Sequence, residues 1–187
     1  MTPVKSLFFA TALIGINLST PVFALEKSPT PSLAIYEDVG RGLGMEWFFQ
    51  SNNGNPILEF GVKETDHRLD RLWEFSCTNF GSKNDTISNT IFAKSPEVRT
   101  DDQFGFSIRI DNGKSFGLIG HKGLFEIQGT QTYFPQFDIS HNHGLWEALR
   151  RGERAFVNLN GNKFSIHLNG SANAINAFLN ACRNRVS

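Results

Sequence analysis

RLWEFSCTNF, residues 71–80, is the stretch from which the fold of this chain can be worked out. Trp73, Phe75 and Cys77 alternate with polar side chains along it. Because successive side chains on a β-strand point to opposite faces, the two rings and the cysteine are expected to share one face. The segment therefore predicts a half-buried strand that holds a cysteine against an aromatic core.

The second of the two cysteines in the chain is Cys182, close to the C-terminus. Residues 171–184 place apolar side chains at helical spacing, which predicts an amphipathic helix with Cys182 on its buried face. Ser171 is expected to cap the N-terminus of this helix, because a serine hydroxyl accepts a hydrogen bond from a free backbone N–H there. The apolar stripe consists of Ala174, Ile175, Phe178, Leu179 and Cys182.

A disulfide between Cys77 and Cys182 is the prediction that joins these two elements. An even number of cysteines in an exported chain favours pairing. The bridge would close a loop of about 105 residues, which corresponds to roughly 4–5 kcal/mol of chain entropy. Two free buried thiols or a redox pair are the alternatives, although the Cys-x-x-Cys spacing of redox pairs is absent.

Export is predicted from residues 1–24, which read as a signal peptide. Lys5 precedes the apolar segment 7–16, which is too short to span a bilayer as a helix. Val22 and Ala24 then place small residues where a signal peptidase cuts, so cleavage is expected after Ala24. An uncleaved membrane anchor or a buried helix is the alternative.

After cleavage, residues 25–34 predict a flexible leader and residues 35–187 a single β-rich domain. Removing residues 1–24 removes one of the 18 basic side chains and none of the 18 acidic ones, so the net charge becomes −1. Nucleic-acid binding needs clustered basic side chains, which the sequence lacks, so no nucleic-acid partner is expected. No second apolar stretch reaches membrane-spanning length, so no membrane span is expected after signal removal. The sequence leaves the oligomeric state open.

Strand patterns and turn residues alternate along the rest of the chain. Residues 104–111 alternate strictly before Asn112-Gly113, and a second hairpin pattern surrounds Asn160-Gly161. Residues 143–153 carry a short helical stripe. We therefore expect a mainly β protein, an antiparallel β-sandwich with one short inserted helix and a disulfide-pinned C-terminal helix. Further strands are expected at 45–51, 56–64, 90–94, 115–120, 123–129 and 133–140.

His141 and His143 form the motif closest to metal chemistry. Two histidines at this spacing can face the same way on a strand and share a metal ion, with Asp138 as a third ligand. A secreted metal-dependent enzyme is the alternative function that this segment suggests. No further ligand is spaced to complete a zinc site, so the sequence predicts no metal, no cofactor and no catalytic set. The segment is then a polar lead-in to the short helix, with Ser140 or Asn142 as its cap.

Candidate binding residues lie in three places. The polar loop 81–89 contains Asn84 and Asp85. Trp47 begins a run of three aromatic residues, of which at least one should face outward on a strand, although a sheet covered on both faces would bury them all. His141 and His143 are the third place, as exposed side chains before the short helix.

The last quarter of the chain contains several motifs in a fixed order. A leucine-rich helix over residues 145–152, the Asn160-Gly161 hairpin, the turn 168–171 and an alanine-rich helix ending in Cys182 follow one another. This order resembles the tail of the invasion-associated locus B family and of periplasmic accessory proteins linked to type VI secretion. The resemblance implies a bacterial periplasmic β-rich domain with a structural disulfide, and it carries over no active residue.

Together these features predict an exported, non-enzymatic binding protein of the bacterial envelope or secreted fraction. The expected partner is an envelope or host protein, and inhibition of a hydrolase or a secretion accessory role is the specific form. The signal peptide predicts a periplasmic or secreted location.

Overall fold

The computed structural model describes residues 37–40, 43–63, 70–79, 86–93, 103–127 and 129–185. All of these residues belong to the compact unit Ala34–Ser187. The predicted signal peptide, residues 1–24, and the predicted leader, residues 25–34, lie outside the described residues.

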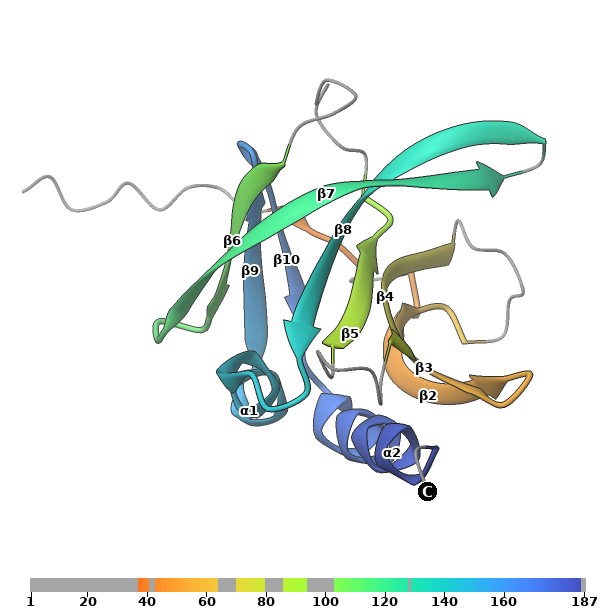
Figure 1. The fold of residues 1–187 in the computed structure, drawn as a ribbon. Coiled ribbons are helices and arrows are strands. Elements are labelled where there is room, and N and C mark those ends of the chain that lie inside the picture. The colour runs from red at the N-terminus through yellow and green to blue at the C-terminus, as the bar shows by residue number, and fades with distance from the viewer. Residues whose placement is uncertain are drawn as a thin grey trace, which may run out of the picture. The chain divides into compact units, whose positions relative to one another are not determined.

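Strands dominate the described part of the chain, as Figure 1 shows, so the mainly β character is confirmed. The strands are β1 (Glu37–Asp38), β2 (Glu46–Asn52), β3 (Asn55–Gly61), β4 (Arg71–Asn79), β5 (Thr86–Ile91), β6 (Phe104–Ile110), β7 (Ser115–Ile127), β8 (Thr130–Ser140), β9 (Arg154–Leu159) and β10 (Asn162–His167). Both predicted helices are present, α1 (Gly144–Arg151) between β8 and β9, and α2 (Ser171–Asn184) after β10.

The ten described strands belong to one curled sheet with the order β1-β10-β9-β6-β7-β8-β5-β4-β3-β2. Neighbours pair antiparallel except β1 and β10, which pair parallel. The predicted sandwich and a purely antiparallel sheet are therefore not confirmed. β1 and β10 lie far apart in the sequence, so no hairpin turn between them imposes an antiparallel direction.

β7 is the reason that the strands form one continuous sheet. Residues 115–120 pair with β6, and residues 121–127 pair with β8. The sequence predicted two strands here, whereas one strand of 13 residues serves both neighbours. Gly120 lies at the junction, where a Cβ would be 2.9 Å from the Phe104 ring and 3.0 Å from the carbonyl oxygen of Gln136. A residue without a side chain is therefore needed where β7 changes partner.

Aromatic side chains fill the inner face of the sheet. Trp73, Phe75 and Cys77 are buried, as predicted, while Glu74 and Ser76 are only partly buried on the opposite face. The rings of Trp73 and Phe75 stack with centroids 4.9 Å apart. Such pairs add to the hydrophobic gain of burying large rings. Other buried rings of the same cluster are Trp47, Phe60, Phe106, Phe137, Trp146 and Phe178.

α1 starts where it does because His143 caps it. The Nδ1 atom of His143 accepts a hydrogen bond from the backbone N–H of Leu145 at 3.2 Å. The cap is therefore His143, and the prediction of Ser140 or Asn142 in this role is wrong. The helix buries Leu145, Trp146 and Leu149.

α2 has no side-chain cap, contrary to the prediction for Ser171. Its N-cap residue is Gly170, whose φ of 82° lies in the left-handed region that glycine tolerates. The Ser171 hydroxyl instead donates to the carbonyl oxygen of Leu149 at 2.7 Å, which ties α2 to α1. The predicted apolar stripe is confirmed, with Ala174, Ile175, Phe178, Leu179 and Cys182 all buried.

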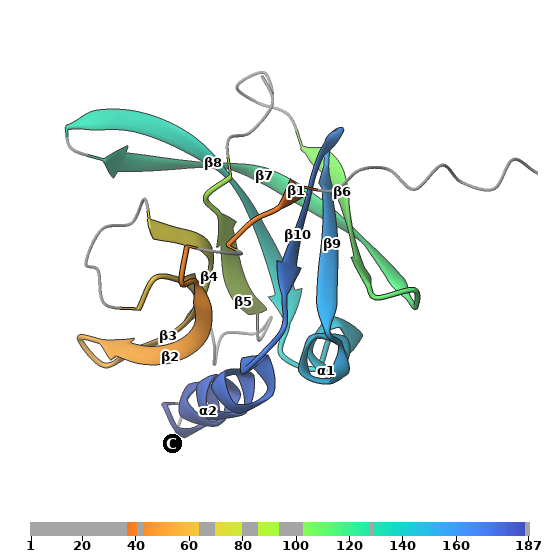
Figure 2. The same cartoon turned by 180° about the vertical axis from the view of Figure 1, so that it is seen from behind.

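Cys77 and Cys182 form the predicted disulfide, with their Cα atoms 5.8 Å apart. This separation is ordinary for a native bridge. The bond attaches the last turns of α2 to β4. Figures 1 and 2 show α2 beside α1 at the same end of the strands, where Trp146 and Phe178 bring their ring centroids within 6.1 Å.

The curl of the sheet brings β2 and β10 into contact, although they stand far apart in the strand order. The indole N–H of Trp47 donates to the carbonyl oxygen of His167 at 2.9 Å. The Nε2 atom of His167 lies 3.1 Å from the carbonyl oxygen of Met45, which can only accept, so Nε2 carries the proton. The His167 ring also meets Phe60 edge-on, with centroids 5.1 Å apart.

Replacing both Cys77 and Cys182 with serine should lower the free energy of unfolding by about 2–5 kcal/mol, because the bridge restricts the unfolded chain. Urea titration of the wild type and the double variant measures the loss. The oxidised wild type should also show no free thiol after denaturation. Two reactive thiols in that material, or equal stability of the two proteins, would contradict the structural role of the bridge.

Candidate functional site

A β-bulge at the start of β4 builds the most organised polar site among the described residues. Gly61 on β3 pairs with Arg71, while Phe60 pairs with Trp73, so Leu72 has no partner of its own. An extra residue in one strand shifts the side chains before it to the other face. The bulge therefore places Arg71 on the outer face of the sheet, beside Glu59.

Gly61 makes room for this arrangement. A Cβ at this position would lie 2.6 Å from the carbonyl oxygen of Asp70 and 2.8 Å from Cδ of Arg71. The first of these atoms belongs to the backbone and cannot rotate away. The absence of a side chain at Gly61 therefore lets the Arg71 stem cross β3 toward Glu59.

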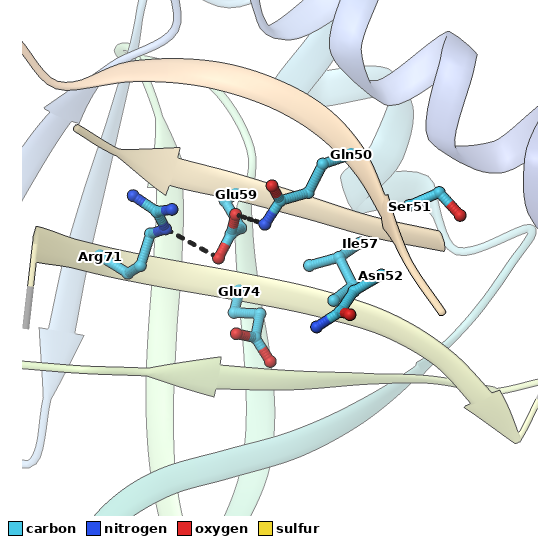
Figure 3. A pocket seen from close by; sticks show the side chains of 7 residues that line it. All are labelled: Gln50, Ser51, Asn52, Ile57, Glu59, Arg71 and Glu74. Carbon is cyan, nitrogen blue, oxygen red and sulfur yellow. Dashed lines mark hydrogen bonds and ion pairs between the residues drawn. The ribbon is translucent and has the colours of Figure 1, made fainter. Parts of the chain in front are cut away.

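Glu59 and Arg71 form a buried ion pair. The Nε atom of Arg71 donates to Oε1 of Glu59 at 2.9 Å. The Arg71 side chain is only 7% exposed and that of Glu59 only 4%. Gln50 donates from Nε2 to the other carboxylate oxygen of Glu59 at 2.6 Å. Figure 3 shows these three side chains converging from β2, β3 and β4. Charge-assisted bonds to both oxygens hold the Glu59 carboxylate in one orientation.

Arg71 makes two further contacts besides its bond to Glu59. Its Nη1 atom donates to the carbonyl oxygen of Val62. Its guanidinium carbon lies 4.9 Å from the centroid of the Phe48 ring, a cation–π contact. The guanidinium of Arg71 therefore contacts protein groups and is largely shielded from solvent.

The ion pair forms the floor of a hollow of about 360 Å³ on the outer face of β2, β3 and β4. We name this hollow the polar recess. Its mouth is formed by the exposed end of β2, where Gln50, Ser51 and Asn52 face solvent. Figure 3 draws all of its lining residues: Gln50, Ser51, Asn52, Ile57, Glu59, Arg71 and Glu74.

The lining of the polar recess carries more negative than positive formal charge. It carries two carboxylates and one guanidinium, so its formal charge is negative. Glu59 lies directly opposite Glu74 in the pairing of β3 with β4. Glu59 is held by two donors, so it is not set up to pass a proton to a substrate.

Trp47 does not form the exposed binding patch that the sequence suggested. It is 5% exposed and belongs to the aromatic core, with its ring centroid 5.4 Å from that of Phe60. The outward-facing member of the aromatic run is Phe48, which Arg71 covers. The burial of both rings agrees with the alternative, a strand that is covered on both faces.

His141 and His143 lie in the turn between β8 and α1. The Nδ1 lone pair of His143 caps α1, so it is not available to a metal. Asp138 accepts a hydrogen bond from the Ser88 hydroxyl at 2.6 Å. Among the residues that the structure describes, no three His, Cys, Asp or Glu side chains gather closely enough to hold a metal ion. The other predicted binding residues, Asn84 and Asp85, lie outside the described residues.

The polar recess was missed at the level of sequence for a physical reason. Alternation predicts that Glu59 faces outward between Leu58 and Phe60, and an outward glutamate is normally solvated. Its burial depends on Arg71, which only the bulge turns to the same face. A glycine that ends a strand, Gly61, is the one signal of a bulge that the sequence offers.

Replacing Gly61 with alanine should lower the free energy of unfolding by about 1–3 kcal/mol, because the new methyl group overlaps backbone atoms. Gly117 on β7 is the matched control, since a Cβ there meets nothing within 4 Å. Gly117→Ala should be neutral or stabilise by up to about 1 kcal/mol. Thermal denaturation of both variants measures their stability relative to the wild type. Equal changes in the two variants would contradict the close approach at Gly61.

The Glu59–Arg71 pair should show strong coupling in a double-mutant cycle. Arg71→Met or Glu59→Leu alone leaves a buried charge without its partner, so each should lose about 3–5 kcal/mol of stability. The double variant should recover most of that loss, because neither charge is then buried. Urea unfolding of the four proteins measures the coupling, and simply additive losses would show that the pair is not a unit.

Comparison of the chain with models of protein families, with characterised proteins and with solved structures gives no match. The resemblance of the C-terminal quarter to the invasion-associated locus B family therefore stays a prediction. None of the helices described in the structure is long and apolar enough to cross a membrane.

Proposed function

We propose that this protein is an exported binding domain of the bacterial envelope or secreted fraction, and that it engages a partner protein through the polar recess. The observation that carries the proposal is the preorganised floor of that recess. Glu59 and Arg71 are held in place by at least one hydrogen bond each beyond their own ion pair. A rigid site loses little conformational entropy when a partner binds.

The disulfide supports the export part of the proposal. Disulfides form and persist in oxidising compartments and are rare in the cytosol. Cys77 and Cys182 are both buried, and neither is a free thiol. A periplasmic or secreted location agrees with this chemistry and with the signal peptide predicted for residues 1–24.

The charge of the recess supports a partner that presents a basic side chain. The lining holds the carboxylates of Glu59 and Glu74 against one guanidinium, that of Arg71, so its net formal charge is −1. A lysine or arginine from a partner would enter a site of opposite charge, whereas an acidic group would be repelled. The amides of Gln50 and Asn52 at the mouth can bond to the partner's backbone.

Affinity capture with the mature, oxidised chain from an envelope fraction tests the proposal. A stoichiometric protein partner is expected. Asn52→Lys should weaken its binding about tenfold or more, because a cation at the mouth repels the partner's basic group, while Asn52→Glu should preserve or strengthen it. Gln131→Lys, at an exposed position of β8, is the control and should leave affinity unchanged.

The two parts of the proposal fail separately. No captured protein would reject the binding function. If a partner is captured but both Asn52 substitutions leave its affinity unchanged, the binding function stands and the polar recess is not the contact site. In that case alanine substitutions at Asn84 and Asp85 test the predicted loop 81–89 as the contact.

A further inference from the structure

The chain contains four Asn-Gly pairs in exposed turns, and they differ in one respect that bears on their chemistry. All eight residues are exposed, so access to solvent does not distinguish the pairs. The hydrogen bonding of the glycine N–H does distinguish them. The pairs are Asn53-Gly54, Asn112-Gly113, Asn160-Gly161 and Asn169-Gly170.

Two of these glycine N–H groups are held by hydrogen bonds. Gly113 donates to the carbonyl oxygen of Ile110 at 2.9 Å. Gly161 donates to Oδ1 of Asn158 at 3.0 Å. In both cases the N–H is engaged by an acceptor other than the asparagine that precedes it.

The other two glycine N–H groups, those of Gly54 and Gly170, are not held in this way. Within the described residues, neither nitrogen donates a hydrogen bond. Asn53 has a φ of 50°, in the tip of the β2–β3 hairpin, while Asn169 is not among the positive-φ residues of the described chain. Asn169 therefore combines an unrestrained neighbour with an ordinary backbone conformation.

We infer that the chain deamidates spontaneously at Asn169-Gly170 and Asn53-Gly54, while the folded structure protects Asn112 and Asn160. In this reaction the Gly170 nitrogen loses its proton and attacks Cγ of Asn169. Ammonia leaves, and a five-membered succinimide joins the two residues. Water then opens either carbonyl, which gives aspartate or isoaspartate, so atoms and charge balance without an oxidant or a reductant.

Deamidation at Asn169 places a new carboxylate where the structure can respond to it. Asn169 lines two hollows together with Arg154 and His167. The Arg154 guanidinium already binds Asp38 at 2.9 Å, so a carboxylate at position 169 would add negative charge to a hollow that this ion pair lines. The same position immediately precedes Gly170, the N-cap of α2, where the helix dipole favours negative charge. The isoaspartate product also adds a backbone methylene just before α2.

Peptide mapping of the oxidised, mature chain during incubation at mildly alkaline pH tests the inference. Peptides with Asn53 and Asn169 should gain the mass of an amide-to-acid conversion several-fold faster than those with Asn112 and Asn160. Isoaspartate should be detectable with a methyltransferase that is specific for it. In denaturant, with the disulfide reduced, all four sites should convert at similar rates.

Two variants separate the role of the glycine N–H from other features of each turn. Asn158→Ala removes the acceptor of Gly161, so Asn160 should change from a slow site to a fast one. Asn169→Gln should abolish conversion at that position and leave Asn53 unchanged, because a glutamine must close a larger ring. Equal rates at the four sites of the folded protein would overturn the inference, as would an unaltered rate at Asn160 in Asn158→Ala.

Discussion

The covalent attachment of α2 to β4 is the constraint on which the rest of the structure depends. A helix of 14 residues is marginal by itself in water, and α2 has no side-chain cap. Its stability therefore comes from the stripe that it buries and from the Cys77–Cys182 bond. In return, Ile175 and Phe178 cover the end of an aromatic core that the curled sheet leaves open. Core and helix are thus stable only together.

The two faces of β2, β3 and β4 differ in the side chains that they carry. The inner face supplies rings to the core, and the outer face carries polar side chains that the sheet holds in register. Phe48, Glu59 and Glu74 occupy directly opposed positions on these three strands. The backbone register therefore aligns these side chains in one row across the outer face.

Local patterns were sufficient to predict most of the elements. Strict alternation located β4 and β6, helical spacing located α1 and α2, and the parity of the cysteines gave the disulfide. These local patterns did not predict how strands distant in the sequence pair. No local signal places β1 parallel to β10, and none makes β7 a single strand, because each depends on residues distant in the sequence. The site followed the same rule, since the burial of Glu59 depends on a bulge twelve residues later that only the folded sheet reveals.

The continuity of β7 has a consequence for how the sheet comes apart. In a sandwich, each sheet can loosen while the other keeps its hydrogen bonds. Here one backbone fixes the register of β6 on one side of Gly120 and of β8 on the other. A slip of one residue in either half would turn the side chains of the other half to the wrong face. We therefore expect the sheet to open as one cooperative unit, with the amides of β6 and β8 exchanging at similar opening free energies.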